Sequence, residues 1–258
     1  MLPADPGALF AGPDGPSLEA FRERWWGRTC LFLPGAAIPF LPAAGEHEAL
    51  LDAVMAALRA AHAELDAAHD GRLRLVRTGP GDRMEALDPV TAAVRAPSWP
   101  PAPGLTWLLH AVDATVPALL PLRRACRVTP SWQVDDLMVS VSADGAGVGA
   151  HADRYDVFLV QLTGCKRWRL EGPGARAAAP GDGIACAPGD VLYVPPGVLH
   201  HGVARGPGMT LSVGFRAPAP ADLLALASAL PGAEVPLALP RPGPGDATPR
   251  LPGEVLRT

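Results

Sequence analysis

The second half of the chain carries residues whose types and spacing could bind a metal ion. His151-Ala152-Asp153 is followed on a later segment by His200 and His201. If the first segment is extended, alternation places His151 and Asp153 on the same side. Two histidines and one carboxylate can cap one face of an Fe(II) ion and leave other positions open for a co-substrate and oxygen. We therefore expect a metal site here. The competing interpretation is that these are loop histidines bound to water.

The third ligand could be either of two adjacent histidines. His200 and His201 end the run PGDVLYVPPGVLHHG (188–202), in which Pro-Pro-Gly is a tight corner. In an extended segment they point to opposite sides. The one that is not a ligand would support the ligands, face the substrate, or lie exposed.

Lys166 begins the basic run KRWRL in the same half of the chain. An inward lysine beside a metal is costly unless it meets an anion, and a dicarboxylate co-substrate would supply one. The alternative is a solvated lysine. Tyr155, Gln161 and Ser212 could hydrogen-bond inside a barrel, although the sequence does not fix their direction. We count Ser212 with Lys166 as a co-substrate contact and Tyr155 as a substrate contact.

Three aspartates add negative charge near the expected mouth of the site: Asp135, Asp136 and Asp156. Such a rim could receive a cationic substrate through charge-assisted hydrogen bonds. Turn capping and solvated loop charge explain the same residues equally well, so both interpretations stay open.

The elements that must position these residues are short β-rich segments separated by glycine and proline. They lie at 134–141, 158–162, 167–170, 191–194 and 209–215. Many short strands with frequent turns are typical of a barrel or sandwich. The pattern predicts a jelly roll in which ligands on adjacent strands converge inside.

The first half reads differently. We expect a helix that begins at Ser17 and ends at Gly27, and then a buried strand at 30–33. We further expect a long amphipathic helix at 46–70 and a strand at 73–77. Loop should follow at 78–103, and then a helix at 106–122 that is broken near Pro117. A short helix is expected at 221–230. The histidines of this half (His47, His62, His69 and His110) are read as solvated, capping or packing residues.

Composition limits the function classes. The chain has 258 residues and a formal net charge of −4, with no dense basic patch, so nucleic-acid binding is not expected. Four scattered cysteines without a CxxC pair suit a reducing compartment. No secretory signal and no apolar run of membrane-spanning length is present. We expect a cytoplasmic protein.

At this point the chain resembles a known family, the bacterial ribosomal oxygenases. The similar segments are DDLMVSVS (135–142), GVGAHADRYDVFLVQLTGCKRWR (147–169), PGDVLYVPPGVLHHG (188–202), LSVGFRAP (211–218) and, upstream, FRERWWGRTCLFLPG (21–35). These enzymes are JmjC-type, cupin-fold hydroxylases that use Fe(II), 2-oxoglutarate and O2. The resemblance implies an α+β protein with a double-stranded β-helix (jelly-roll) core, a mainly helical N-terminal region and a short C-terminal extension.

The resemblance also implies residue roles. His151, Asp153 and His200 match the iron ligands, since the family's ligand follows Pro-Pro-Gly by three positions. Lys166 falls where these enzymes bind the distal carboxylate of 2-oxoglutarate. The bacterial relatives carry arginine there and many JmjC relatives lysine; only arginine offers a planar fork. His201 becomes a candidate substrate contact with Asp135, Asp136 and Tyr155.

The expected organisation is a loose N-terminus (1–16), an α/β region (17–125), a catalytic core (126–218) and a short helix with an irregular tail (219–258). Family members usually continue into a helical dimerisation region and a winged-helix domain, and this chain has room only for the start of the first. The implied reaction is hydroxylation of an arginine on a ribosomal large-subunit protein. A ribosomal or other basic protein is the expected partner, without nucleic acid or membrane, and a homodimer stays open. The alternatives are a small-molecule 2-oxoglutarate oxygenase and a non-catalytic metal-binding cupin.

Overall fold

The computed structural model describes residues 5, 7–12, 15–42, 47–65, 71–89, 96–175 and 183–216. Within them, nine strands form one antiparallel sheet in the order β1-β8-β6-β9-β5-β4-β2-β3, with β7 paired to β6. The strands are β1 (Leu31–Leu33), β2 (Leu73–Thr78), β3 (Met84–Leu87), β4 (Leu105–Leu109), β5 (Val134–Ser142), β6 (Asp156–Glu171), β7 (Ile184–Cys186), β8 (Val191–Val194) and β9 (Leu199–Phe215).

The helices of the described residues are α1 (Leu18–Arg24), α2 (His47–Ala63) and α3 (Leu120–Ala125). Single turns of 3-10 helix lie at Ala8–Phe10, Ile38–Phe40, Pro80–Asp82, Val112–Ala114, Pro117–Leu119 and Ser131–Gln133. No helix in this part of the chain is long and apolar enough to cross a membrane.

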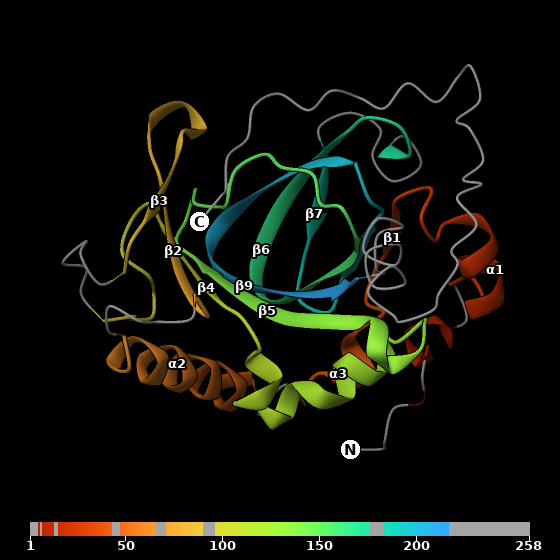
Figure 1. Cartoon of the computed structure of the whole chain (residues 1–258), viewed down its shortest axis with the longest axis horizontal. Helices are drawn as coiled ribbons and strands as arrows, with labels where there is room; N and C mark the ends of the chain where they lie inside the picture. Colours follow the sequence, from red (N-terminus) through yellow and green to blue (C-terminus); the bar gives the residue numbers. More distant parts are fainter. Residues whose placement is uncertain are drawn as a thin grey trace, which may run out of the picture. The chain divides into compact units, whose positions relative to one another are not determined.

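Strands β6 and β9 form the centre of the sheet and bend together. Their pairing runs from Asp156 opposite Phe215 to Glu171 opposite Leu199, with register shifts on either side of Thr163. Gly164 lies at this bend with a φ of +67°, and a Cβ there would approach Pro207 O to 2.4 Å. Only glycine fits such a position without strain. In Figure 1, β5, β6 and β9 curve around a common interior. This confirms the expected jelly-roll core with a helical N-terminal region.

The larger core lies between the sheet and the helices of the first half. Helix α2 buries Leu50, Val54 and Leu58 in it, as the amphipathic pattern predicts, and α3 adds Leu122. Figure 1 shows α2 and α3 along the same side of the sheet. A smaller cluster around Leu159, Trp168, Cys186 and Leu192 fills the region that β6, β7 and β8 share. The jelly roll is therefore held by apolar side chains that flank the strands carrying the candidate site.

Helix α1 begins where the sequence indicates. The Ser17 Oγ accepts a hydrogen bond from the Ala20 N–H at 3.1 Å, which satisfies one of the free amides of the first turn. Phe21 is fully buried and stacks on Phe10, with ring centroids 4.4 Å apart. Leu9 is buried as well. The expectation of a loose N-terminus is therefore wrong for Ala8–Phe10, because two large apolar side chains anchor this turn in the core.

The helix predicted at 106–122 is wrong for its first part, whereas its end is helical, with the 3-10 turn Pro117–Leu119 leading into α3. Leu105–Leu109 is the strand β4, which pairs with β2 on one side and β5 on the other, and all five of its residues are buried. A short apolar run covered on both faces has no alternation, so periodicity cannot separate such a strand from a buried helix. Strand β3 lies within the segment expected as loop at 78–103, and strand β7 was not predicted.

Several expectations fall outside the described residues. They are the end of the long helix at 66–70 with His69, and the helix and tail after residue 218. The side chain of His47 is also outside the description.

Candidate active site

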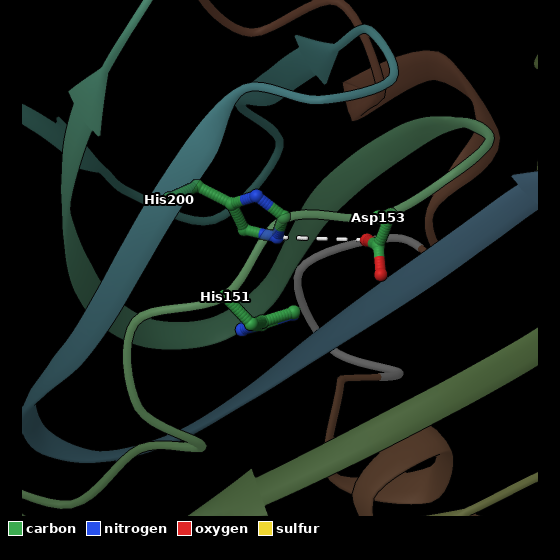
Figure 2. A group of neighbouring side chains, drawn as sticks. All are labelled: His151, Asp153 and His200. Atoms are coloured by element: carbon green, nitrogen blue, oxygen red, sulfur yellow. Dashed lines mark ion pairs between the residues drawn. The ribbon is translucent and has the colours of Figure 1, made fainter. Parts of the chain in front are cut away.

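His151, Asp153 and His200 converge from two segments of the chain. The backbones of His151 and His200 exchange two hydrogen bonds, His151 N to His200 O at 3.1 Å and His200 N to His151 O at 2.8 Å. The Asp153 carbonyl accepts from Gly197 N at 2.8 Å, in the corner before β9. Figure 2 shows the three side chains turned toward one another. The start of β9 and the loop before β6 thus fix the three residues as one unit.

The loop that delivers His151 passes very close to its neighbours. A Cβ on Gly147 would stand 2.2 Å from Gly202 O, so this position has no room for a side chain. The Thr78 hydroxyl donates to Gly147 O at 3.4 Å and accepts from Gly147 N at 3.2 Å. The end of β2 therefore holds the loop against β9, and this contact sets the position of His151.

The donor atoms of the three side chains are suited to one metal ion. One ligand atom from each lies within 4.8 Å of the others, and His200 Nε2 is 3.6 Å from Asp153 Oδ2. His151 Nδ1 faces Gly149 O at 3.0 Å and His200 Nδ1 faces Val198 O at 3.1 Å. A carbonyl only accepts, so in the neutral ring each Nδ1 carries the proton and each Nε2 keeps a lone pair. This is the tautomer that an Nε2-bound metal requires.

The environment of His200 favours its neutral form. Burial lowers the pKa of His200, and the neighbouring His151 lowers it further. A histidine binds metal only when it is deprotonated, so this environment reduces the competition from protons.

A cavity of about 100 Å³ opens beside the three residues. One water needs roughly 10–15 Å³ by the same measure, so the cavity has room for a small organic acid. Its lining comes from β4 to β6, β9 and the segments next to them: Leu108, His110, Asp135, Asp136, Met138, Ser140, Val148, His151, Asp153, Tyr155, Val157, Leu159, Lys166, Trp168, His200, Gly202, Thr210, Ser212, Gly214 and Arg216. Eight of the nine candidate site residues therefore line one cavity, and His201 is the exception.

Lys166 is the buried cation of this cavity. Its side chain is 3% exposed, and its Nζ donates to the Ser140 Oγ at 3.1 Å and lies 5.6 Å from the centroid of the Trp168 ring. Within the described part of the chain Lys166 forms no ion pair. Burial lowers its pKa to about 8. A buried ammonium without a carboxylate partner is costly, so the chemistry of this end of the cavity is suited to an anion.

Hydroxyl and amide groups complete the wall around Lys166. The Ser140 hydroxyl donates to Thr210 O at 3.3 Å, and the Thr210 hydroxyl donates to Gln161 Oε1 at 2.9 Å. Ser212 lines the same cavity, as expected of a co-substrate contact, whereas Gln161 is buried behind Thr210 and does not line it.

Charged groups gather at the other end of the cavity. Asp135 forms an ion pair with Arg216, with Nε 2.7 Å from Oδ2, and the Arg216 guanidinium lies 5.6 Å from the centroid of the Tyr155 ring. Asp136 contacts His110 Nδ1 at 2.5 Å. The pairing between β5 and β9 changes register between Val134 and Leu137, and both aspartates line the cavity there. His110 was expected to be a packing residue, and its contact with Asp136 shows that expectation to be wrong.

Two other expectations at the mouth need correction. Asp156 does not line the cavity; its carboxylate accepts hydrogen bonds from the Tyr193 hydroxyl and from Gly27 N, so it holds α1 to the sheet. His201 does not line the cavity either, since it alternates with His200 and pairs with Arg169 across the sheet. The structure therefore gives no support to a substrate contact at His201.

Sequence reasoning missed Met138, Ser140, Thr210 and Trp168. A signal for them was present, because residues two apart on a strand share a face. Once Asp136, Lys166 and Ser212 are taken to point inward, alternation along β5 selects Met138 and Ser140. Alternation along β6 selects Trp168, and along β9 it selects Thr210. No such signal existed for His110 and Arg216, which lie just beyond the ends of β4 and β9.

Comparisons with known proteins agree with this architecture. Residues 121–223 match the JmjC domain family. Over 130 residues the chain is 41% identical to the ribosomal protein uL16 3-hydroxylase of Escherichia coli, covering 45% of this chain and 35% of that protein. It is 39% identical over 111 residues to a probable ribosomal oxygenase of Haemophilus influenzae, covering 37% of this chain and 27% of the relative.

Solved structures give the same result over a longer stretch. The ribosomal oxygenase YcfD from Escherichia coli superposes with a TM-score of 0.60 and 29% identity, covering 93% of this chain and 62% of that one. YcfD in complex with cobalt and 2-oxoglutarate superposes with a TM-score of 0.56 and 29% identity, covering 92% and 61%. The chain thus matches about a third of the length of its curated relatives and about three fifths of these structures. Residues 121–223 thus match the JmjC domain family, and the chain that carries them is similar in sequence and fold to ribosomal oxygenases.

Proposed function

We propose that this chain is an Fe(II)- and 2-oxoglutarate-dependent oxygenase that hydroxylates a protein side chain, with an arginine of a ribosomal large-subunit protein as the expected target. The observation that carries the proposal is one cavity with two complementary features. A His-Asp-His set with both Nε2 lone pairs free lies beside it, and the unpaired ammonium of Lys166 is buried in its wall. A ligand that chelates a metal and carries a second carboxylate fits both features.

In this proposal His151, Asp153 and His200 hold the iron. Their donor set, two imidazoles and one carboxylate, is the facial arrangement that leaves three positions for co-substrate and oxygen. Lys166 binds the distal carboxylate of 2-oxoglutarate, with Ser140 keeping its Nζ in place through the 3.1 Å hydrogen bond. Ser212 is a further polar group within reach of the co-substrate. The family resemblance and the cobalt and 2-oxoglutarate complex of YcfD support this assignment.

Bound iron and 2-oxoglutarate would supply the oxidation, in which O2 and 2-oxoglutarate become succinate, CO2 and the oxygen of a new C–OH group. The chain itself contributes position and shielding. Leu108, Met138, Val157 and Leu159 form an apolar part of the cavity wall, which limits water near the reacting carbon. Asp153, held through its backbone by Gly197, keeps its carboxylate aimed at the two histidines.

The substrate class rests on charge at the cavity mouth and on the relatives. Asp135, Asp136 and Tyr155 line the end away from Lys166 and could receive a guanidinium through charge-assisted hydrogen bonds and ring stacking. The curated relatives carry names that refer to ribosomal proteins or ribosomes. Such a substrate would place the reaction in the cytoplasm.

Mass spectrometry of ribosomal proteins tests the proposal. The proteins are incubated with the chain, Fe(II), ascorbate and 2-oxoglutarate, and in parallel with an Asp153→Ala variant. We expect one protein to gain one oxygen on one arginine with the unchanged chain and none with the variant. Consumption of 2-oxoglutarate that depends on Asp153, without any modified protein, would redirect the search to small molecules. No Asp153-dependent consumption at all would refute the oxygenase.

A further inference from the structure

His110 and Ala111 hold one carboxylate at the cavity mouth from two directions. His110 Nδ1 lies 2.5 Å from Asp136 Oδ2, and Ala111 N donates to Asp136 Oδ1 at 2.8 Å. Each oxygen of Asp136 therefore has one partner from consecutive residues of the segment that follows β4. The carboxylate cannot rotate without losing both contacts.

The backbone is strained at this point. Ala111 has φ 51° and ψ 37°, and among the described residues it is the one non-glycine with a positive φ. A left-handed alanine costs roughly 1–2 kcal/mol. This conformation turns the Ala111 amide and the His110 ring toward the same side chain. The strained backbone therefore coincides with the two contacts to Asp136.

The two neighbouring aspartates are not equivalent. Asp135 already forms an ion pair with Arg216, whose side chain is 65% exposed. Asp136 accepts from a backbone amide and an imidazole, which together use two of its about four lone-pair positions. Burial alone would raise the pKa of Asp136. The hydrogen bonds from His110 and Ala111, together with electrostatic attraction from His110 and Arg216, outweigh it, and the pKa lies below its usual value. Asp136 is thus an oriented, ionised carboxylate with acceptor positions left over.

We propose that His110 is a positioning residue that orients the Asp136 carboxylate toward the cavity, where it receives the cationic side chain of the substrate. This inference rests on the proposed function, because it concerns recognition at the same site. His110 itself need not touch the substrate. It sets the direction of the carboxylate and, through that, the preference for a charged over a neutral side chain.

The test compares two small probes, Nα-acetyl-arginine methylamide and its citrulline analogue, which has nearly the same shape without the charge. Ligand-observed NMR titration gives the dissociation constant of each. For the unchanged chain we expect the arginine probe to bind about tenfold more tightly, which is the order of one hydrogen bond to a charged group. His110→Leu should remove this preference, while binding of the citrulline probe stays the same.

A conservative variant separates positioning from packing. In His110→Asn the side-chain amide stands near the place of Nδ1 and can still donate to Asp136, so the preference for the arginine probe should return. Asp136→Asn should lose the preference whatever residue stands at 110, because the charged acceptor is gone. His110→Ala, which removes the same donor, serves in place of His110→Leu if that variant does not fold.

A preference for the arginine probe that is as strong in His110→Leu as in the unchanged chain would overturn the inference. Its retention in Asp136→Asn, or its absence in the unchanged chain, would overturn the inference as well. None of these outcomes touches the oxygenase itself. That proposal is judged by Asp153-dependent consumption of 2-oxoglutarate without any arginine probe, so the two can fail separately.

Discussion

Lys166 carries a charge that the ligand-free fold disfavours. Its pKa falls from 10.5 to about 8 because the side chain is buried. At pH 7 this corresponds to a cost on the order of 3 kcal/mol, since one pKa unit equals about 1.36 kcal/mol. The unfolded chain keeps this proton up to about pH 10.5, so the stability of the ligand-free protein should rise between about pH 8 and pH 10.5. This cost is consistent with the proposal that an anion binds there.

Co-substrate binding should therefore depend on pH in the opposite sense. The carboxylate of 2-oxoglutarate pairs with the protonated lysine, and the empty site loses that proton above about pH 8. We expect the dissociation constant of 2-oxoglutarate to rise by up to about tenfold per pH unit above that value. The rise should end where the pH exceeds the pKa of Lys166 in the complex with 2-oxoglutarate. Calorimetric titrations between about pH 7 and pH 9.5, with Mn(II) in place of Fe(II), measure it.

Lys166→Met is the control for this pH dependence. It keeps an unbranched apolar chain and removes the titrating group, so its weaker binding should not vary over the same pH range. A wild-type affinity that stays flat, or a methionine variant with the same slope, would show that another group governs the binding of 2-oxoglutarate.

At the residue scale the sequence predicted the groups that could bind a metal and an anion. His151, Asp153, His200 and Lys166 were all named from spacing, alternation and resemblance, and the structure brings all four to one cavity. Their metal and co-substrate roles stay predictions. His110 was misread because its partner Asp136 lies far along the chain, and a contact between segments so distant leaves no local pattern.

At the scale of elements, glycines at two bends show how the strands are held. Gly164 in β6 and Gly206 in β9 both have positive φ, +67° and +76°. A Cβ at Gly164 would meet Pro207 O at 2.4 Å, whereas a Cβ at Gly206 would meet nothing within 4 Å. The two positions therefore share the backbone conformation and differ in the space around it.

Alanine substitutions at these glycines should separate the two effects. We expect Gly206→Ala to lower the free energy of unfolding by about 1 kcal/mol, the cost of the conformation alone, and Gly164→Ala by at least ~3 kcal/mol, because the backbone of β9 must also move. Urea denaturation of both variants beside the unchanged chain measures the difference. Equal losses in the free energy of unfolding would mean that the backbone of β9 moves away at Pro207 without a measurable cost.

The elements were predictable where one face is buried and the other is not. Helix α2 and the capped start of α1 follow from periodicity and from Ser17. Strand β4 was not predictable because it is buried on both faces. The length of β9 was also missed, since Gly202, Gly206 and Gly208 interrupt the sequence of a strand that runs from Leu199 to Phe215.

At the scale of the whole molecule, the chain places one cavity where β5, β6 and β9 meet. The candidate metal ligands lie beside it, the buried cation lies in its wall, and the carboxylates lie toward its mouth. The jelly roll could be predicted from the strand pattern, whereas the ordering of nine strands could not, because their pairing joins segments far apart in sequence. The choice of substrate stays a proposal.

An anaerobic titration with Fe(II) and 2-oxoglutarate, followed through the visible absorption of their chelate, tests the central claim most directly. The unchanged chain should give a band that saturates with one equivalent of iron. Asp153→Ala should give no band. Lys166→Met should need at least about 30-fold more 2-oxoglutarate to saturate the band, as expected for breaking a buried charge pair. An equally strong band in Asp153→Ala, or none in the unchanged chain, would contradict the claim that these residues hold iron and its co-substrate.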